Sequence, residues 1–150
     1  MDHYSLSEDI KVMCITADHF PEGIEAAHQQ LHAKFQEKEE YRRFFGISKP
    51  NEQGQIIYKA AAEELHKGET EALGLESFTI KKGHYNSFYL KDYAENPGCI
   101  AEAFEILLGQ AEIDPKGYCL EWYIGTNDVK CLVPVDEDHL HFTGVNNEKI

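Results

Sequence analysis

The sequence predicts an α+β fold in which one β-α-β-β unit occurs twice and the two copies share a core. Two segments carry apolar residues at helical spacing, and each follows an apolar strand and precedes two further strands. A chain of 150 residues is long enough for one domain with a real core, but each half alone is too small to bury its sheet. We therefore expect antiparallel sheets related by a pseudo-two-fold axis, with both long helices on one side and a cleft between the units.

The first unit begins with an apolar strand predicted over residues 10–17. A helix follows, for which Asp18 suits the cap region and Pro21 suits the first turn. The apolar side chains of this helix form one stripe, which consists of Ile24, Ala27, Leu31 and Phe35. Two strands over residues 42–48 and 56–63 complete the unit, and the segment between them is rich in turn-forming residues.

The second unit repeats this order. A long strand is predicted over residues 75–89, with a bulge or bend at Gly83. A helix then starts at Asn96 and Pro97, which suit the cap and the first turn. Its apolar stripe consists of Ile100, Ala103, Phe104, Leu107, Leu108 and Ala111. A tight hairpin over residues 117–135 closes the unit.

These elements define a single domain with four parts. The first unit spans about residues 8–65 and the second about 75–135, and a polar, glycine-bounded linker over 66–74 joins them. Residues 136–150 are interpreted as a tail whose role stays open. That tail contains two histidines, His139 and His141.

Charge and composition exclude several classes of function. The net charge of −13 repels phosphate backbones, so we expect no direct nucleic-acid binding. No run of about 18 apolar residues occurs, which argues against a membrane span. The acidic N-terminal segment lacks the apolar core of a secretory signal, so a cytoplasmic location is expected. Monomer and homodimer both stay open.

Cysteine and histidine spacing does not favour a metal or cofactor site. None of the four cysteines forms a Cys-x-x-Cys pair, which favours reduced, buried side chains. His28 and His32 stand four residues apart on the first helix, but no third ligand is evident, so we expect residues at the helix boundary. No nucleotide-binding glycine motif occurs, and no cofactor is expected.

The hairpin contains the residue with the clearest chemical role, Glu121. Strand alternation places Leu120, Trp122 and Ile124 on one face and Cys119, Glu121 and Tyr123 on the other. An acid beside aromatic rings is typical of a pocket for cationic or aromatic molecules. Two alternatives stay open: Glu121 faces solvent, or it pairs with a lysine such as Lys130 or Lys59. Trp122 is expected in the core unless a bulge reverses the faces.

Aromatic residues from both units are the candidate walls of this pocket. Tyr123 shares the strand face of Glu121, and Phe44 is preferred over Phe45 for the cleft side of its strand. The predicted ligand-binding residues are Glu121, Tyr123, Tyr85, Tyr58 and Phe44.

Several short motifs occur in an order that resembles a known family. They are Phe45-Gly-Ile47, Tyr58-Lys-Ala-Ala61, Gly83-His-Tyr85, Leu120-Glu-Trp-Tyr-Ile124 and Leu132-Val-Pro-Val135. Together they resemble the GyrI-like family, also called the AraC-type effector-binding domain or two-SHS2-unit fold. The resemblance covers roughly residues 8–135.

The resemblance implies a small-molecule cleft between the two units, with Glu121 as its matching acidic residue. Family members bind hydrophobic, often cationic compounds, and many serve bacterial transcription regulation as multidrug or effector sensors. This chain is therefore expected to be a stand-alone effector-binding domain in sensing, regulation or xenobiotic response. Two alternatives follow from other family members: a hydrolase of electrophilic, cyclopropane-containing toxins with Glu121 as general base, and a module that regulates a partner such as gyrase or a separate DNA-binding regulator.

Overall fold

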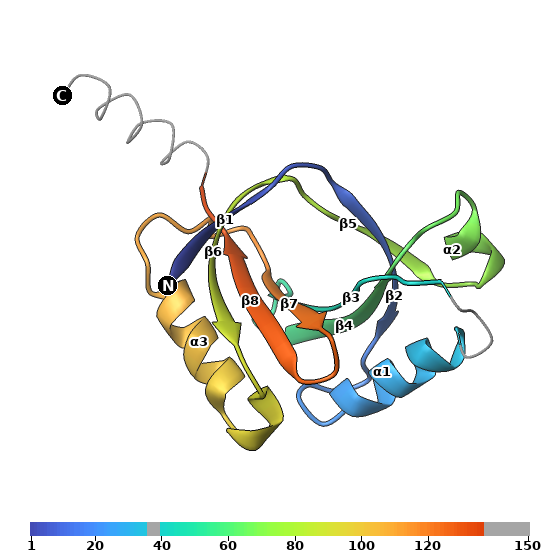
Figure 1. Cartoon of the computed structure of the whole chain (residues 1–150), viewed down its shortest axis with the longest axis horizontal. Coiled ribbons are helices and arrows are strands. Elements are labelled where there is room, and N and C mark those ends of the chain that lie inside the picture. Colours follow the sequence, from blue (N-terminus) through green and yellow to red (C-terminus); the bar gives the residue numbers. More distant parts are fainter. Residues whose placement is uncertain (36–39, 137–150) are drawn as a thin grey trace.

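The computed structural model describes residues 1–35 and 40–136 as one curled antiparallel sheet with two long helices on one side (Figure 1). The strands are β1 (Asp2–Leu6), β2 (Ile10–Thr16), β3 (Phe44–Pro50), β4 (Ile56–Glu63), β5 (Glu76–Ile80), β6 (Gly83–Leu90), β7 (Cys119–Ile124) and β8 (Asp128–Pro134). The helices are α1 (Ile24–Ala33), α2 (Glu69–Ala72) and α3 (Cys99–Leu108), with a short 3-10 turn η1 (Tyr93–Glu95). The predicted α+β class with paired helices is confirmed.

The strand order makes the duplication visible. Within the described part of the chain it is β1-β6-β8-β7-β3-β4-β2-β5, and every pairing is antiparallel. The β2-α1-β3-β4 unit and the β6-α3-β7-β8 unit occupy the two halves of this order and meet where β3 pairs with β7. The pseudo-two-fold axis therefore passes between these two central strands.

A two-stranded ribbon crosses between the halves and curls the sheet into a half-barrel. The chain runs from β1 in the second half into β2 in the first, and from β5 in the first half into β6 in the second. Near the crossing Leu6 pairs with Gly83 and Ile10 pairs with Ile80. The amide of Lys82 donates to Asp9 Oδ1 over 2.8 Å. Figure 1 shows this ribbon arching over the sheet on the side away from α1 and α3.

The crossing changes two expectations drawn from the sequence. The single strand expected over residues 75–89 is two strands, β5 and β6, because each half pairs with a different neighbour. Residues 2–6, which precede the predicted first unit, form β1 at the outer edge of the second half.

Apolar side chains fill both faces of the sheet. Inside the curled sheet lies a cluster that includes Phe45, Ile47, Tyr85, Leu120 and Leu132. On the other face α1 packs through Ala27 and Leu31, and α3 packs through Ala103 and Leu107. Burial of one large aliphatic side chain contributes about 1.5–3 kcal/mol, so these stripes hold the helices to the sheet.

Most predicted element boundaries shift by a few residues. The first helix begins at Ile24 with Gly23 as its N-cap, after a turn that contains Asp18 and Pro21. The second begins at Cys99 after Gly98, because that glycine adopts a left-handed conformation at φ 88°. By contrast, β4 has the predicted bounds, Ile56–Glu63.

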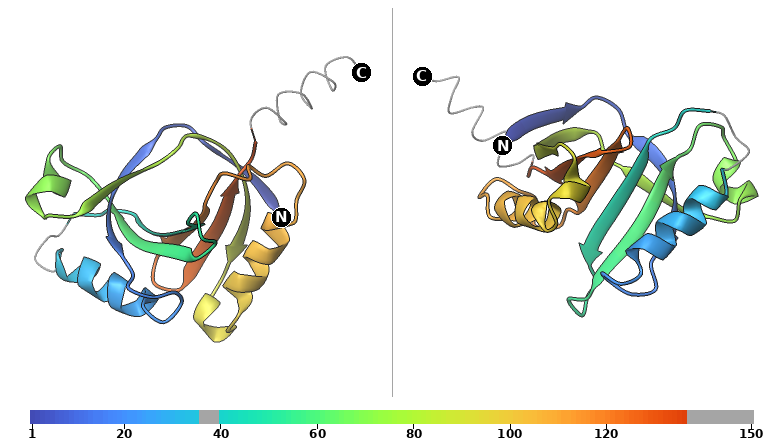
Figure 2. Two further views of the ribbon diagram at one scale, coloured as in Figure 1. Left: turned by 180° about the vertical axis from the view of Figure 1, so that it is seen from behind. Right: turned by 60° about the horizontal axis from the view of Figure 1, so that its bottom comes forward.

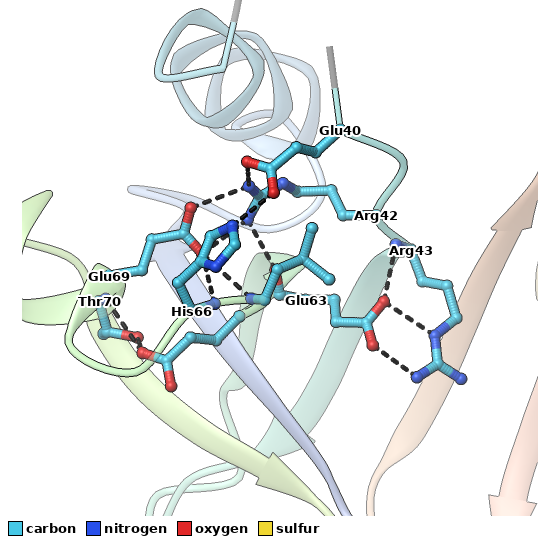
Figure 3. A network of polar contacts seen from close by, with 9 residues as sticks. Glu40, Arg42, Arg43, Glu63, His66, Glu69 and Thr70 are labelled. Atoms are coloured by element: carbon cyan, nitrogen blue, oxygen red, sulfur yellow. Dashed lines mark hydrogen bonds and ion pairs between the residues drawn. The ribbon is translucent and has the colours of Figure 1, made fainter. Parts of the chain in front are cut away.

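The segment expected as a polar linker, residues 66–74, contains α2 and a buried carboxylate. Arg42 donates to Glu69 Oε1 and Oε2 over 3.0 and 2.8 Å and to the Glu63 carbonyl over 2.9 Å (Figure 3). The Arg42 guanidinium also lies 4.3 Å from the centre of the Phe35 ring. This bidentate pair attaches α2 to the segment that leads into β3, because arginine matches the geometry of a carboxylate.

No helix in residues 1–35 or 40–136 is long and apolar enough to cross a membrane. The four cysteines, Cys14, Cys99, Cys119 and Cys131, are free thiols. The tail histidines His139 and His141 lie outside the described residues.

Candidate functional site

A cleft of about 1160 Å³ lies between α1 and α3, at the junction of the two halves. Its floor comes from the central strands through residues such as Phe44 and Glu121. One wall carries His28 and His32 from α1, and the other carries Ile100 and Phe104 from α3. The right-hand view of Figure 2 shows both helices on the same side of the sheet, with central strands between them. The site is therefore assembled from both copies of the repeated unit.

Strand alternation along β7 directs Glu121 into this cleft. Cys119, Glu121 and Tyr123 line it, whereas Leu120 belongs to the cluster inside the curled sheet. Trp122 packs with Leu120 on that opposite face, and its ring centre lies 5.8 Å from that of Phe45. The predicted assignment of the two faces of this strand is confirmed.

Glu121 is held by two tyrosine hydroxyl groups. Tyr58 donates to Glu121 Oε1 over 2.9 Å, and Tyr123 donates to the same oxygen. His28 Nε2 lies 2.7 Å from the Tyr58 hydroxyl, which links α1 to the group. We call these four residues, His28, Tyr58, Glu121 and Tyr123, the acid cluster. They come from α1, β4 and β7, so both halves of the fold contribute to it.

Gly46 provides the space in which the acid cluster forms. It pairs with Glu121 across β3 and β7 and with Ala60 across β3 and β4. A Cβ atom at Gly46 would lie 2.1 Å from the Tyr58 hydroxyl oxygen and 2.5 Å from Glu121 Oε1. The absence of a side chain on β3 therefore lets a phenol and a carboxylate from its two neighbouring strands meet above it.

Burial dominates the electrostatics of Glu121. It raises the pKa of the carboxyl, while hydrogen bonds from Tyr123 and Tyr58 act in the opposite direction by favouring the ionised form. The described residues contain no ion pair that involves Glu121. Lys59 pairs with Glu76 at 3.1 Å, and Lys130 lies 4.1 Å from the centre of the Tyr4 ring. Neither lysine considered from the sequence is its partner.

The neighbouring side chains in the cluster are neutral at physiological pH. Burial and the charge of Glu121 raise the pKa values of Tyr58 and Tyr123 above the usual tyrosine range, so both phenols keep their protons. Burial and the nearby His32 lower the pKa of His28 to about 4. Among these four residues, Glu121 is therefore the group whose charge a bound cation can stabilise.

Of the other residues predicted for the site, Phe44 and Tyr58 lie with Glu121, but Tyr85 does not. Phe44 lines the cleft and stacks on His32 with ring centres 4.2 Å apart. Tyr85 packs inside the curled sheet, where its hydroxyl donates to the Lys81 carbonyl over 2.5 Å. The expectation that Tyr85 shares the cleft with Glu121 does not match this placement. In β6 the alternate residues, such as Phe88, face α3.

Several lining residues were not recognised from the sequence as part of a binding site. The sequence predicts His28 and His32 as residues at the helix boundary, yet both line the cleft. Their position beside the apolar stripe of α1 is a sequence signal for this placement. The stripe faces the sheet, so residues on its flank lie at the edge of the helix–sheet contact, where a cleft can open. Phe20 and Tyr93, from the turn before α1 and from η1, had no comparable signal. Within the described residues, no group of three potential metal ligands is present.

Comparison with known proteins shows a shared fold at low sequence identity. No family model matches the sequence, and no curated relative was found. A structure of SAV2435 bound to tetraphenylphosphonium aligns with a TM-score of 0.65 and 13% identity, over 90% of this chain and 94% of that one. An integron cassette protein from the mobile metagenome of Vibrio cholerae aligns with a TM-score of 0.61 and 11% identity, over 89% and 94%. A hydrolase from Listeria innocua aligns at 0.57 and 12%, over 89% and 90%.

Proposed function

We propose that this protein binds a small hydrophobic cation in the cleft between α1 and α3, with Glu121 as the anionic anchor. The observation that carries the proposal is a carboxylate without a basic partner among the described residues, placed in a largely apolar cleft. Dehydration of an ionised carboxylate is costly unless another charge compensates for it. A bound cation supplies that compensation.

The cleft also offers aromatic rings to such a ligand. Phe44, Tyr93, Phe104 and Tyr123 line it. A cation over an aromatic face gains about 0.5–2 kcal/mol, depending on how far it is removed from water. Attraction between unit charges about 5 Å apart is roughly 3 kcal/mol at the effective dielectric constant of about 20 that suits protein sites. Charge and ring contacts therefore favour the same kind of ligand.

The structural comparison supports this ligand class independently of the sequence. SAV2435, which shares the fold, was solved with tetraphenylphosphonium, a lipophilic cation. At 13% identity the similarity concerns the fold alone. The reason to propose the same ligand class for this chain is its own acid cluster.

The experiment compares two ligands of the same shape and opposite charge. Calorimetry should show binding of tetraphenylphosphonium and much weaker binding of tetraphenylborate, because the negative ion meets the charge of Glu121. Glu121→Gln should weaken tetraphenylphosphonium binding by roughly tenfold or more, about 1.4 kcal/mol. Glu105→Gln is the matched control, because this exposed carboxylate on α3 does not line the cleft.

Equal affinity of the native protein and Glu121→Gln for tetraphenylphosphonium would contradict the anchoring role of the acid. Equal affinity for the phosphonium and the borate would show that the cleft selects ligands by shape and not by charge. An effect of Glu105→Gln as large as that of Glu121→Gln would mean that net charge, rather than the cleft carboxylate, attracts the ligand.

Hydrolysis of an electrophilic substrate is the second candidate function. The observation in its favour is a carboxyl with a raised pKa beside two phenols in a cleft, which is a suitable arrangement for a general base and a polarising donor. In this reaction Glu121 would activate water and a cleft tyrosine would polarise the substrate. Mass spectrometry of a cyclopropane-containing probe should then show turnover that disappears in Glu121→Gln while the probe still binds.

We infer from the family resemblance that ligand binding serves sensing or transcription regulation through a separate partner. A purified DNA-binding regulator or gyrase should then bind the chain with an affinity that tetraphenylphosphonium changes. Binding that the ligand leaves unchanged would separate the interaction from the cleft.

A further inference from the structure

The direction of each hydrogen bond in the acid cluster can be assigned from the number of protons available. A bound cation favours the ionised form of Glu121, which only accepts, so in that state both phenols direct their single protons to Glu121 Oε1. The Tyr58 oxygen can then only accept from His28, and it lies 2.7 Å from Nε2. His28 must therefore carry its proton on Nε2, and its Nδ1 is left as an acceptor because the ring is neutral.

Two acceptor atoms of the cluster then stay available for a ligand. In the described residues neither Glu121 Oε2 nor His28 Nδ1 has a hydrogen-bond partner. No fully buried side-chain nitrogen or oxygen in this part of the chain lacks a partner. These two atoms must therefore reach accessible space, and both residues line the cleft.

Arg42 and Ser48 are two potential donors of the cleft lining. The cation among the described lining residues, Arg42, directs its guanidinium to Glu69 and to the Glu63 carbonyl. Ser48 lies opposite Cys119 in the register of β3 and β7. The acid cluster thus presents two acceptor atoms, Glu121 Oε2 and His28 Nδ1, to which no side chain in the described residues donates.

We propose that the cleft selects cations that carry N–H donors, such as protonated aromatic amines, amidines and guanidines, over fully alkylated cations of similar size. This proposal rests on the proposed function and names the ligand class of the same site. A donor ligand satisfies both Glu121 Oε2 and His28 Nδ1. A quaternary cation neutralises the charge but leaves both acceptors dehydrated and unpaired.

The physical basis is the asymmetry between making a hydrogen bond and losing one. A paired donor and acceptor contribute modestly, but an acceptor that is covered by a ligand and left unpaired loses its water without replacement. Sites built to pair polar groups therefore discriminate strongly against analogues that lack them. For this cleft we expect about tenfold discrimination in affinity, which is the ratio for roughly 1.4 kcal/mol.

The test uses two planar dyes that are both monocations at neutral pH. Proflavine carries amino and ring N–H donors, and 3,6-bis(dimethylamino)-10-methylacridinium has the same frame without any. Fluorescence titration of the native protein should give an affinity for proflavine at least tenfold higher. In His28→Leu this ratio should fall at least threefold, because one of the two acceptors is gone.

The matched control is His19→Leu, which changes the same residue type outside the cleft. His19 is exposed and does not line the cleft, so the affinity ratio of the two dyes should stay at the native value. The two dyes differ by the same methyl groups in every variant. A change in their affinity ratio between variants therefore does not come from the bulk of these groups.

The native ratio decides the proposal even if His28→Leu fails to fold. Equal affinities for the two dyes, with Glu121→Gln weakening both, would overturn the donor selectivity and leave the proposed cation binding intact. An unchanged ratio in folded His28→Leu would overturn the role of Nδ1. If neither dye nor tetraphenylphosphonium binds, the proposed function fails and this inference fails with it.

Discussion

At the scale of single residues, the site depends on the missing side chain of Gly46 as much as on the carboxyl group of Glu121. The Tyr58 hydroxyl and Glu121 Oε1 occupy the volume in which a side chain of β3 would stand. Strand alternation predicted that Glu121 and Tyr123 share a face, and the preference for Phe44 over Phe45 agrees with the position of Phe44 in the cleft. Nothing in the sequence connects Gly46 with these residues, because that connection depends on the register between three strands.

Gly46→Ala should therefore disrupt the acid cluster. The new methyl group would overlap two polar side-chain atoms at 2.1 and 2.5 Å, so the Tyr58 and Glu121 side chains would have to leave their hydrogen-bonded positions. We expect a loss of about 1–3 kcal/mol in unfolding free energy, as for other overpacked sites. Denaturant unfolding measures this loss, and tetraphenylphosphonium affinity should fall with it.

Gly109→Ala is the control for this substitution. Gly109 has ordinary right-handed geometry at the end of α3, and a Cβ atom there meets its nearest neighbours at 3.5 Å. Replacement of glycine by alanine at a compatible position stabilises by about 0.4–1 kcal/mol. Equal unfolding free energies for the two variants would refute the steric role of Gly46.

Ligand affinity should also depend on pH through Glu121. Burial raises the pKa of this carboxyl, and a bound cation favours its ionised form. Tetraphenylphosphonium affinity should therefore be highest at neutral pH and fall as the pH decreases, with the midpoint above the ordinary glutamate value of 4.5. Titrations in Glu121→Gln should show no such midpoint, and a pH-independent native affinity would contradict the assignment.

At the scale of elements, the α2 segment shows how a short polar stretch becomes structural. A four-residue helix has little stability of its own, because helix formation needs several turns to offset nucleation. Glu69 overcomes this limit through Arg42, whose side chain is almost fully buried against Phe35. The sequence suggested a linker because glycines and charges surround this segment, and charge pairs between distant residues leave no local pattern.

Glu69→Gln should destabilise the fold, because it leaves the buried Arg42 without its charge partner. Breaking a buried pair by removing one member typically costs about 3–5 kcal/mol. Glu71→Gln in the same helix is the control, since Glu71 is exposed, and we expect less than about 0.5 kcal/mol for such a surface change. Chemical denaturation of both variants measures the difference, and equal stabilities would contradict a structural role of the pair.

The same pair gives the native protein a defined response to acid. Hydrogen bonds from Arg42 lower the pKa of Glu69 to about 2, below its unfolded value of 4.5. A depressed folded-state pKa stabilises the fold above pH 4.5, and this contribution is lost as the pH falls towards about 2. The stability difference between native protein and Glu69→Gln should shrink over this interval, and a constant difference would contradict the linkage.

At the scale of the whole molecule, the duplication places the cleft on the pseudo-two-fold axis. The repeated β-α-β-β order was readable from periodicity, and β4 was predicted with its final bounds because turn-forming residues precede it and a polar segment follows it. The crossing of β1 and β2 with β5 and β6 was not readable, since it depends on which half each strand joins. The same ambiguity explains why Tyr85 was predicted for the cleft but lies inside the curled sheet. Neither periodicity nor motif distinguishes the inside of the sheet from the side that carries the helices.

Since α1 and α3 come from different halves and both line the cleft, one ligand should stabilise both helices together. At a hundredfold excess over its dissociation constant, a ligand adds about 2.7 kcal/mol to the unfolding free energy. Hydrogen exchange with saturating tetraphenylphosphonium should therefore slow in Ile24–Ala33 and Cys99–Leu108, and locally frayed amides of the edge strands β1 and β5 should change less. Glu121→Gln under the same ligand concentration should show weaker protection of both helices. Protection confined to one helix would mean that the ligand occupies one unit, and a binding site shared across the axis would then be wrong.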